Sequence, residues 1–450
     1  MKTLICGGQV IHDSGSDVCD VLIEEGRIAA IGINLPRPVD ALMIDACGLT
    51  VLPGMIDFHV HVDSRIGRYE LSDTYHSGSK AAVLAGVTTL IGFVTQAPHK
   101  SLRECVDDAR AKVNDRSYAD VAVHLTPTRF AETDWQDIDD LIEVGCRTFK
   151  FYTTYKAAGL YQDYSTLSDI MRRLSDRNVR ILIHAEDQDV LDAADREYAD
   201  AKDIFSYAKL RSPQAEVAAI RHVAELARET GASIHIVHVS TAEGARLINE
   251  YRSTTAISCE TAPQYLLLND DLLAARNGHR YLCTPPLRSE ENRRAMEQHA
   301  VSGLFDIFAT DHCPFRRKDK DTVNGDVRNV PSGLAGVGGL VPLLYEQLVI
   351  RNQLPLTDLV KRLSTNPAQL AGLYPRKGAI QVGTDADLLI LNRNGSPRPI
   401  LSSYSDCYET YPDHTTTLDF QYVFLRGEIV VKDNMLTNPE QPTGRALWRN

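Results

Sequence analysis

Two hydrophobic patterns divide the chain of 450 residues. Residues 1–52 and 375–450 carry short alternating apolar runs separated by turn residues, which predicts antiparallel strands joined by hairpins. Within residues 20–32, two such runs flank a Gly-Arg pair that we expect to form a hairpin turn. Because both ends of the chain share this pattern, we predict that they pair into one small β-sandwich domain.

Residues 53–374 show a different pattern, in which apolar strand-like runs alternate with amphipathic stretches of helical spacing. The amphipathic stretches include residues 77–86, 165–177, 215–231 and 240–253. The apolar runs are residues 49–60, 86–95, 119–127, 145–154, 179–186, 232–240, 255–262 and 305–312. These eight strand-helix units predict an α/β fold, a (β/α)8 TIM barrel. A doubly wound sheet is the alternative, but no GxGxxG motif follows a strand.

The composition is that of a folded protein with an acidic surface. A formal charge of −12 argues against binding to nucleic acid or to an anionic membrane. The nine cysteines are scattered without a CxxC pair, which favours reduced thiols. The N-terminal segment lacks the hydrophobic length of a signal peptide, and no window approaches the roughly 20 apolar residues that span a bilayer. We therefore expect a soluble cytoplasmic protein that binds neither nucleic acid nor a membrane.

Polar residues fall at the ends of the predicted strands, which form the catalytic face of a parallel barrel. His59 and His61 are two residues apart in the stretch PGMIDFHVHVD, so the two-residue period of a strand directs both side chains to one side. Two imidazoles presented in this way can bind one metal ion. An HxH pair alone is also compatible with hydrogen-bonded core histidines.

Lys150 lies between two phenylalanines at the end of the fourth predicted strand. A lysine in this position either extends to the rim and pairs with a carboxylate or is truly buried. Burial would depress the pKa of the amine and make it nucleophilic enough to capture carbon dioxide as a carbamate. A carbamylated lysine is an anionic ligand that can bridge two cations.

Three more ligand-type residues, His184, His238 and Asp311, end the fifth, sixth and eighth predicted strands. Each alone is compatible with a structural role, but six such residues at the ends of five strands point to a metal site. His235 and His312 compete with their neighbours. His235 is three residues before His238, an odd offset, so we expect at most one of the two to face the barrel interior. We choose His238, and expect His312 to point away from Asp311.

The sequence resembles the cyclic amidohydrolases of the amidohydrolase superfamily, which include hydantoinase, dihydropyrimidinase, allantoinase and dihydroorotase. The resemblance covers essentially the whole chain and rests on PGMIDFHVH, TFKFYTTYK, HAED, VHVS, CETAPQYLLL, CTPPLR, ATDHCPF and GAIQVGTDADLLIL. It implies a barrel with a centre of two divalent metal ions, usually zinc, bridged by a carbamylated lysine. By this resemblance, the ligands of the more buried ion are His59, His61 and Asp311, those of the other are His184 and His238, and Lys150 bridges both.

The resemblance also implies a mechanism. A hydroxide bridging the metals attacks a ring carbonyl, and Asp311 carries the proton to the leaving ring nitrogen. Tyr155 stands where hydantoinases and dihydropyrimidinases have a tyrosine that hydrogen-bonds the developing oxyanion. Thr284 and Ser332 stand where these enzymes usually have serine and asparagine, positions that bind the ring amide mostly through backbone groups.

Asp63 stands where the closest dihydroorotases carry an arginine that binds the substrate carboxylate. A carboxylate there would repel an anionic ring substituent, which favours hydantoin or dihydropyrimidine rings. Dihydroorotase or allantoinase activity is the alternative, because Arg65 or Arg68 on the following loop could bind a carboxylate. A non-catalytic scaffold is a further alternative, disfavoured because every ligand position is filled. Relatives of this type are often homodimers or homotetramers.

Overall fold

The barrel is formed by eight parallel strands that pair in chain order. The computed structural model describes residues 2–12, 15–322 and 326–448. The strands are β6 (Met55–Val60), β9 (Val87–Thr95), β10 (Asp120–Thr126), β11 (Thr148–Tyr152), β12 (Arg180–His184), β13 (Ile234–Ile236), β14 (Ile257–Thr261) and β15 (Ile307–Phe308). The barrel closes where Val60 bridges His312 in parallel and the His61 N–H donates to the His312 carbonyl at 2.7 Å. All eight predicted strands and the (β/α)8 barrel are confirmed.

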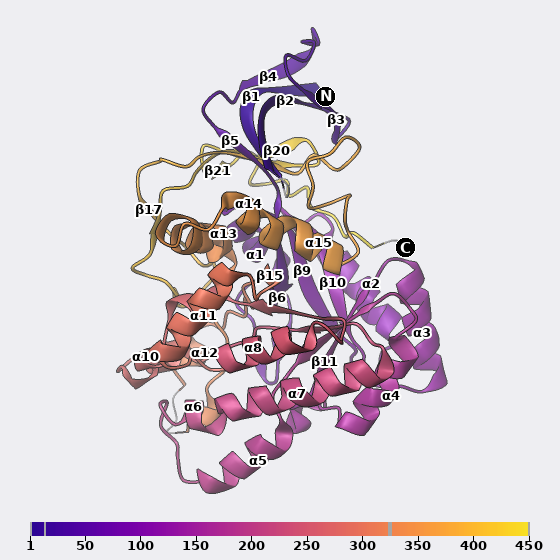
Figure 1. Cartoon of the computed structure of the whole chain (residues 1–450), viewed down its shortest axis with the longest axis vertical. Coiled ribbons are helices and arrows are strands. Elements are labelled where there is room, and N and C mark those ends of the chain that lie inside the picture. The colour runs from indigo at the N-terminus through magenta and orange to yellow at the C-terminus, as the bar shows by residue number, and fades with distance from the viewer. Residues whose placement is uncertain (1, 13–14, 323–325, 449–450) are drawn as a thin grey trace.

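Helices cover the outside of the barrel between successive strands (Figure 1). The helices of at least eight residues are α1 (Tyr75–Leu84), α2 (Leu102–Val113), α3 (Glu132–Glu143), α4 (Tyr164–Leu174), α5 (Gln188–Glu197), α7 (Pro213–Thr230), α8 (Ala242–Tyr251) and α11 (Glu290–Ser302). Shorter ones are α6 (Tyr207–Leu210), α9 (Pro263–Leu267), α10 (Asp271–Ala274), α12 (Arg317–Lys320), α13 (Leu340–Leu344), α14 (Leu356–Val360) and α15 (Asn366–Leu370). Helix α4 shows why they pack here, since Leu167, Ile170, Met171 and Leu174 form one buried stripe.

Strand β12 contributes to two separate hydrophobic layers. In β12, Ile181 and Ile183 belong to the large core between strands and helices, whereas Leu182 belongs to a smaller cluster with Ile56 and Ile91 inside the barrel. Because side chains alternate along a strand, His184 follows Leu182 on the interior side. The alternation therefore directs the polar residue at the strand end into the barrel mouth.

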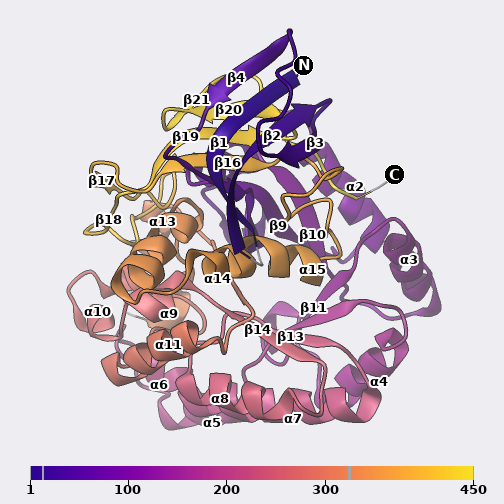
Figure 2. The ribbon, with the colours of Figure 1, turned by 45° about the horizontal axis from the view of Figure 1, so that its top comes forward.

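The two chain ends pair into one further sheet, as predicted, which lies at one side of the barrel (Figure 2). Its strands are β1 (Lys2–His12), β2 (Gly15–Glu24), β3 (Arg27–Gly32), β4 (Ala41–Asp45), β5 (Thr50–Pro53), β16 (Leu388–Asn392), β19 (Asp419–Leu425), β20 (Glu428–Lys432) and β21 (Met435–Leu436). The ends meet where β5 pairs antiparallel with β16. A separate core of residues from both ends fills this small domain. The domain boundaries at residues 52 and 374 stay a prediction.

The hairpin turn expected at Gly-Arg lies one residue earlier. Strand β2 ends at Glu24 and β3 begins at Arg27, so the turn consists of Glu25 and Gly26, with φ of 50° and 80°. Two consecutive left-handed residues are the conformation that a two-residue hairpin of this twist requires. Arg27 therefore belongs to the strand.

In the described part of the chain, two short antiparallel strand pairs lie outside the main sheets. Strands β7 (Arg65–Ile66) and β8 (Tyr69–Glu70) form one on the loop after β6, and β17 (Arg398–Pro399) pairs with β18 (Thr415–Thr416) in the other. Among the residues described, no helix is both long enough and apolar enough to cross a membrane.

Candidate metal centre and active site

Three predicted ligands meet at the mouth of the barrel. His59, His61 and Asp311 each offer a ligand atom within 4.8 Å of the others. The Nε2 atoms of His59 and His61 lie 3.2 and 3.4 Å from Oδ1 of Asp311. Asp311 follows the short strand β15 with a φ of 51°, which turns its side chain toward the two histidines. The first and last strands of the barrel therefore bring one donor set together.

Glu260 orients His59 from below and was missed by the sequence analysis. Its Oε1 lies 2.5 Å from Nδ1 of His59, and its Oε2 lies 3.2 Å from Nε2 of His235. Burial opposes ionisation, yet the two imidazoles hold the pKa of Glu260 well below its usual range. Because Nδ1 of His59 is occupied, Nε2 is left for a metal. A charged residue in the apolar strand ISCET was the available signal.

Both His235 and His238 face the barrel interior, so the prediction that at most one does is wrong. His235 contacts Ser258 Oγ at 2.8 Å and Glu260, which point inward from β14. The alternation fails because β13 ends at Ile236 and His238 has a φ of 39°. His235 lies one layer below the strand-end residues, and His238 reaches the mouth.

His184 and His238 form a second donor pair. Nδ1 of His184 lies 2.9 Å from Nε2 of His238, and the ring of His238 lies 5.4 Å from that of His59. Nε2 of His184 lies 2.7 Å from Glu186, so this carboxylate orients the imidazole of His184. Sequence analysis had noted the motif HAED without assigning a role to Glu186.

Lys150, on β11, is buried, with 1 % of its surface exposed. Its ammonium lies 5.4 Å from the ring centre of Phe93 and 5.2 Å from that of Tyr152. Burial lowers the pKa of Lys150 to about 7, although Glu260 and Asp311 oppose the change. Near neutral pH a large fraction of the side chain is therefore the free amine.

The protonation states of the donors fit a bound cation. Burial lowers the pKa of His184 to about 4 and that of His238 well below its usual value, and it also lowers the pKa of His61. Desolvation opposes ionisation of the partly buried Asp311, but His59 and His61 keep its pKa below the usual range. At neutral pH the imidazoles thus carry free lone pairs and the aspartate a charge, as metal binding requires.

Of the residues predicted to bind substrate, Tyr155 lies beside a predicted metal ligand. The ring of Tyr155 lies 5.0 Å from that of His184. Thr284 and Ser332 are joined by Tyr207, whose hydroxyl lies 2.5 Å from Thr284 Oγ1 and accepts a hydrogen bond from Ser332 Oγ at 2.9 Å. The sequence offered no signal for Tyr207, which comes from α6 and is distant from both in the chain.

The acidic and basic residues after β6 mostly contact protein groups. Oδ2 of Asp63 accepts a hydrogen bond from the Tyr75 N–H at 2.9 Å, at the start of α1. Its role toward substrate stays a prediction. Nη2 of Arg68 donates to the Tyr69 hydroxyl at 2.7 Å, and Arg65 begins the exposed hairpin β7–β8.

His312 points away from Asp311, as predicted. Its Nε2 contacts Asp73 at 3.0 Å, and its Nδ1 accepts a hydrogen bond from the Gly336 N–H at 3.0 Å. Both ring nitrogens are thus used in fixing the loop after β15, and neither is left for a metal or a substrate.

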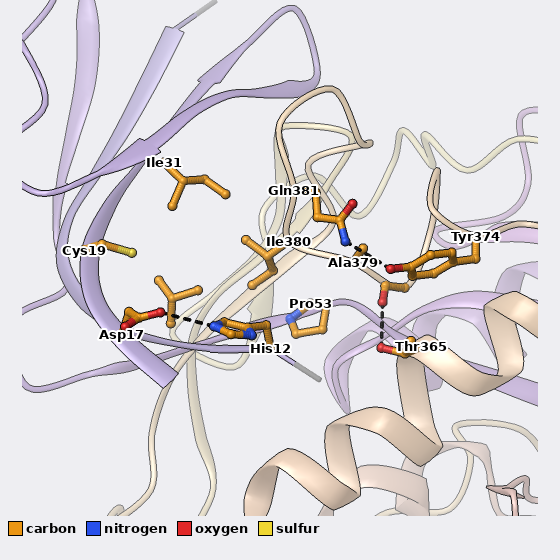
Figure 3. A pocket seen from close by; sticks show the side chains of 12 residues that line it. His12, Asp17, Cys19, Ile31, Pro53, Thr365, Tyr374, Ala379, Ile380 and Gln381 are labelled. Atoms are coloured by element: carbon orange, nitrogen blue, oxygen red, sulfur yellow. Dashed lines mark hydrogen bonds and ion pairs between the residues drawn. The ribbon is translucent and has the colours of Figure 1, made fainter. Parts of the chain in front are cut away.

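A cavity of about 240 Å³ lies away from this centre, between the small domain and the segment around Thr365 and Tyr374 (Figure 3). Its polar groups contact one another, with His12 3.2 Å from Asp17 and Gln381 donating to the Tyr374 hydroxyl at 3.0 Å. None of the strand-end donors lines it.

A (β/α)8 barrel with a histidine and carboxylate cluster at the strand ends defines a metal-binding barrel protein of the hydrolase type. Residues 50–430 match the sequence model of the amidohydrolase family. The chain therefore belongs to the amidohydrolase family.

Similar proteins match most or all of the length of the chain. The D-hydantoinase of Streptomyces coelicolor is 31% identical, over 97% of this chain and 96% of the relative. The dihydropyrimidinase of Arabidopsis thaliana is 29% identical, over 88% of this chain and 75% of the relative. Among solved structures, a D-hydantoinase superimposes with a TM-score of 0.94 at 29% identity, covering 100% and 99% of the two chains. The dihydropyrimidinase of Brevibacillus agri gives 0.93 at 28% identity, covering 100% of both.

Proposed function

We propose that the protein opens the ring of a cyclic amide or ureide of the hydantoin or dihydropyrimidine type by metal-dependent hydrolysis. The observation that carries this proposal is the convergence of His59, His61 and Asp311 at the barrel mouth. Their neighbours complete the donor set expected for two ions. A scaffold role is disfavoured because all these positions hold competent ligands. The names of the relatives support the substrate class.

We propose zinc as the metal, because imidazole and carboxylate donors suit it. One ion would be held by His59, His61 and Asp311, the other by His184 and His238. The free amine of Lys150 would add to carbon dioxide and lose a proton, giving a carbamate between the two sites. When bound, such a pair of ions supplies a water of lowered pKa and polarises a carbonyl.

The side chains of the site would transfer the proton, stabilise the oxyanion and bind the ring. Asp311, ionised at neutral pH, accepts the proton of the attacking water and delivers it to the leaving ring nitrogen. Burial raises the pKa of Tyr155 well above its usual value, so the phenol stays protonated and donates a hydrogen bond to the developing oxyanion. Backbone groups at Thr284 and Ser332 bind the ring amide, with Tyr207 fixing both side chains.

The preferred rings are those without an anionic substituent. Asp63 carries a negative charge on the loop where a dihydroorotase would need a cation. Arg68 already donates to the Tyr69 hydroxyl, and its Nη2 also lies 3.4 Å from the Asn329 carbonyl. Dihydroorotase and allantoinase activities are the second candidates, for which Arg65 is the remaining cation on this loop.

A substrate panel tests the function. The protein is purified with zinc and bicarbonate, and turnover of hydantoin, dihydrouracil, allantoin and dihydroorotate is compared. We expect hydantoin or dihydrouracil to be hydrolysed best, and the Asp311→Asn variant to be inactive on each. Turnover of dihydroorotate alone would contradict the proposed specificity.

We further propose a cytoplasmic homodimer or homotetramer. The nine cysteines are all free thiols, as a reducing compartment favours. Light scattering of the purified protein measures the oligomeric state directly.

A further inference from the structure

Tyr155 has an unusual backbone conformation for a residue with a side chain. Its φ of 71° and ψ of 44° place it in the left-handed region. Such conformations are disfavoured for residues other than glycine, and they persist where the surrounding structure fixes them. Among the contacts that anchor the preceding backbone, the Thr153 N–H donates to the His184 carbonyl at 3.2 Å, and Thr154 Oγ1 donates to Gln188 Oε1 at 2.9 Å. Neither contact reaches the phenol ring.

Arg211 covers the ring of Tyr155. Its guanidinium carbon lies 5.2 Å from the ring centre, within the range of a cation–π contact. Arg211 is itself held by Glu186, to which both its Nε (3.1 Å) and its Nη2 donate. The carbonyl of Arg211 accepts a hydrogen bond from Arg288 Nη1 at 2.5 Å. The arginine is thus fixed at both its backbone and its side chain.

The same carboxylate connects Arg211 to the donor pair. Oε2 of Glu186 contacts Nε2 of His184 at 2.7 Å, on the side of the imidazole opposite to His238. Glu186 is completely buried, so this charge depends on Arg211 for compensation. One bidentate pair therefore fixes a predicted ligand on one side and the phenol on the other.

We infer that Arg211 is a positioning residue that holds the Tyr155 ring over the centre so that its hydroxyl meets the developing oxyanion. This inference rests on the role proposed for Tyr155. Arg211 acts through the ring of Tyr155 and through Glu186. Nothing in the sequence motifs pointed to it, because it lies in the segment between α6 and α7.

A double-mutant cycle tests the inference on the metal-loaded enzyme. The variants are Arg211→Met, Tyr155→Phe and the two combined, with metal content measured in each. Small misplacements of a catalytic group lower turnover by about a hundredfold, so we expect Arg211→Met to reduce kcat by about tenfold to a hundredfold with little change in KM. In the Tyr155→Phe background, the same substitution is expected to cause a clearly smaller loss, because the part that acts through the hydroxyl is already absent and only the part that acts through Glu186 remains.

Arg173→Met is the matched control. Arg173 also lies over an aromatic ring, 4.3 Å from the centre of Trp135, and pairs with Glu132 at 2.8 Å, but on α4 away from the centre. We expect its kcat to equal that of the wild type. An equal loss from Arg211→Met in both tyrosine backgrounds would overturn the inference.

Hydrogen exchange of backbone amides in the metal-free protein tests the positioning role without an activity assay. Amides of residues 153–162 are expected to exchange faster in Arg211→Met than in the wild type, and at the wild-type rate in Arg173→Met. Unchanged exchange in Arg211→Met overturns the positioning role. A wild type that hydrolyses no cyclic amide refutes the proposed function instead, and exchange still decides the role of Arg211.

Discussion

Glu260 shows how a single buried charge can organise a metal site. With 1 % of its surface exposed, it compensates for burial by contacts with His59 and His235 on opposite carboxylate oxygens. A carboxylate behind a ligand imidazole fixes its tautomer and orientation and raises its basicity. A charged side chain inside the barrel thus orients a predicted metal ligand, in addition to the packing around it.

Replacing this carboxylate is expected to weaken metal binding. The Glu260→Gln variant should bind zinc about 10- to 100-fold less tightly, because an amide cannot accept hydrogen bonds from both histidines as a carboxylate does. Competition with a chromogenic chelator measures the affinity.

Glu297→Gln is the control for loss of a partly buried carboxylate. Glu297 pairs with Arg293 at 3.0 Å and lies on α11, outside the centre. Its zinc affinity is expected to match the wild type. Equal affinities of Glu260→Gln and the wild type would refute the orienting role of Glu260.

Among the elements, the start of β10 and the start of β16 are joined by a buried ion cluster. Nζ of Lys377 lies 2.6 Å from both Asp120 and Asp387 and 3.1 Å from Asp385. Arg426, at the turn between β19 and β20, contacts Asp120 as well. Burial opposes ionisation of Asp120, but Lys377 and Arg426 hold its pKa below the usual range. The cluster therefore fixes the small domain on the barrel.

Removing the central cation should destabilise the protein strongly. Lys377→Met leaves three carboxylates close together without it, and breaking a buried pair costs about 3–5 kcal/mol. Urea denaturation measures the free energy of unfolding.

Lys100→Met is the control, because Lys100 and Asp108 form a solvent-exposed pair whose loss is expected to change the stability little. If Lys377→Met is no less stable than Lys100→Met, the cluster does not contribute to holding the small domain on the barrel.

At the scale of the whole molecule, the centre is an assembly of distant segments. Its donors come from the ends of β6, β11, β12, β13 and β15, around the entire barrel. Metal that binds only the folded chain therefore stabilises the closed barrel by mass action.

Metal removal is expected to lower the stability of the wild type. At free zinc about 100- to 1,000-fold above its dissociation constant, chelation should remove about 3–4 kcal/mol. Calorimetry with and without chelator measures the shift in Tm.

The Lys150→Ala variant shows how much the proposed Lys150 carbamate contributes to zinc binding beyond the other ligands. We expect it to bind less zinc than the wild type and to respond less to the chelator, because the proposed carbamate is lost. Unchanged zinc content in this variant would exclude a bridging role for Lys150.

Much of the fold followed from local patterns. Alternation and helical spacing depend only on neighbours in the chain, and all eight barrel strands were placed from them. The hairpin turn was predicted one residue too late, because it consists of Glu25 and Gly26. The prediction that only one of His235 and His238 faces the barrel interior was also wrong. In both cases a left-handed residue broke the local period, and such a residue leaves no hydrophobic pattern.

The sequence by itself determined the strand-end residues, because strand period and strand end are local properties that six ligand-type residues share. Only the tertiary structure decided what supports them. Glu260 reaches His59 across 201 positions in the chain, and Tyr207 joins Thr284 and Ser332 from 77 and 125 positions away. These contacts depend on barrel closure and on loop paths, which no local period encodes. The same holds for Arg211, whose place over Tyr155 exists only after the fourth, fifth and sixth units have packed together.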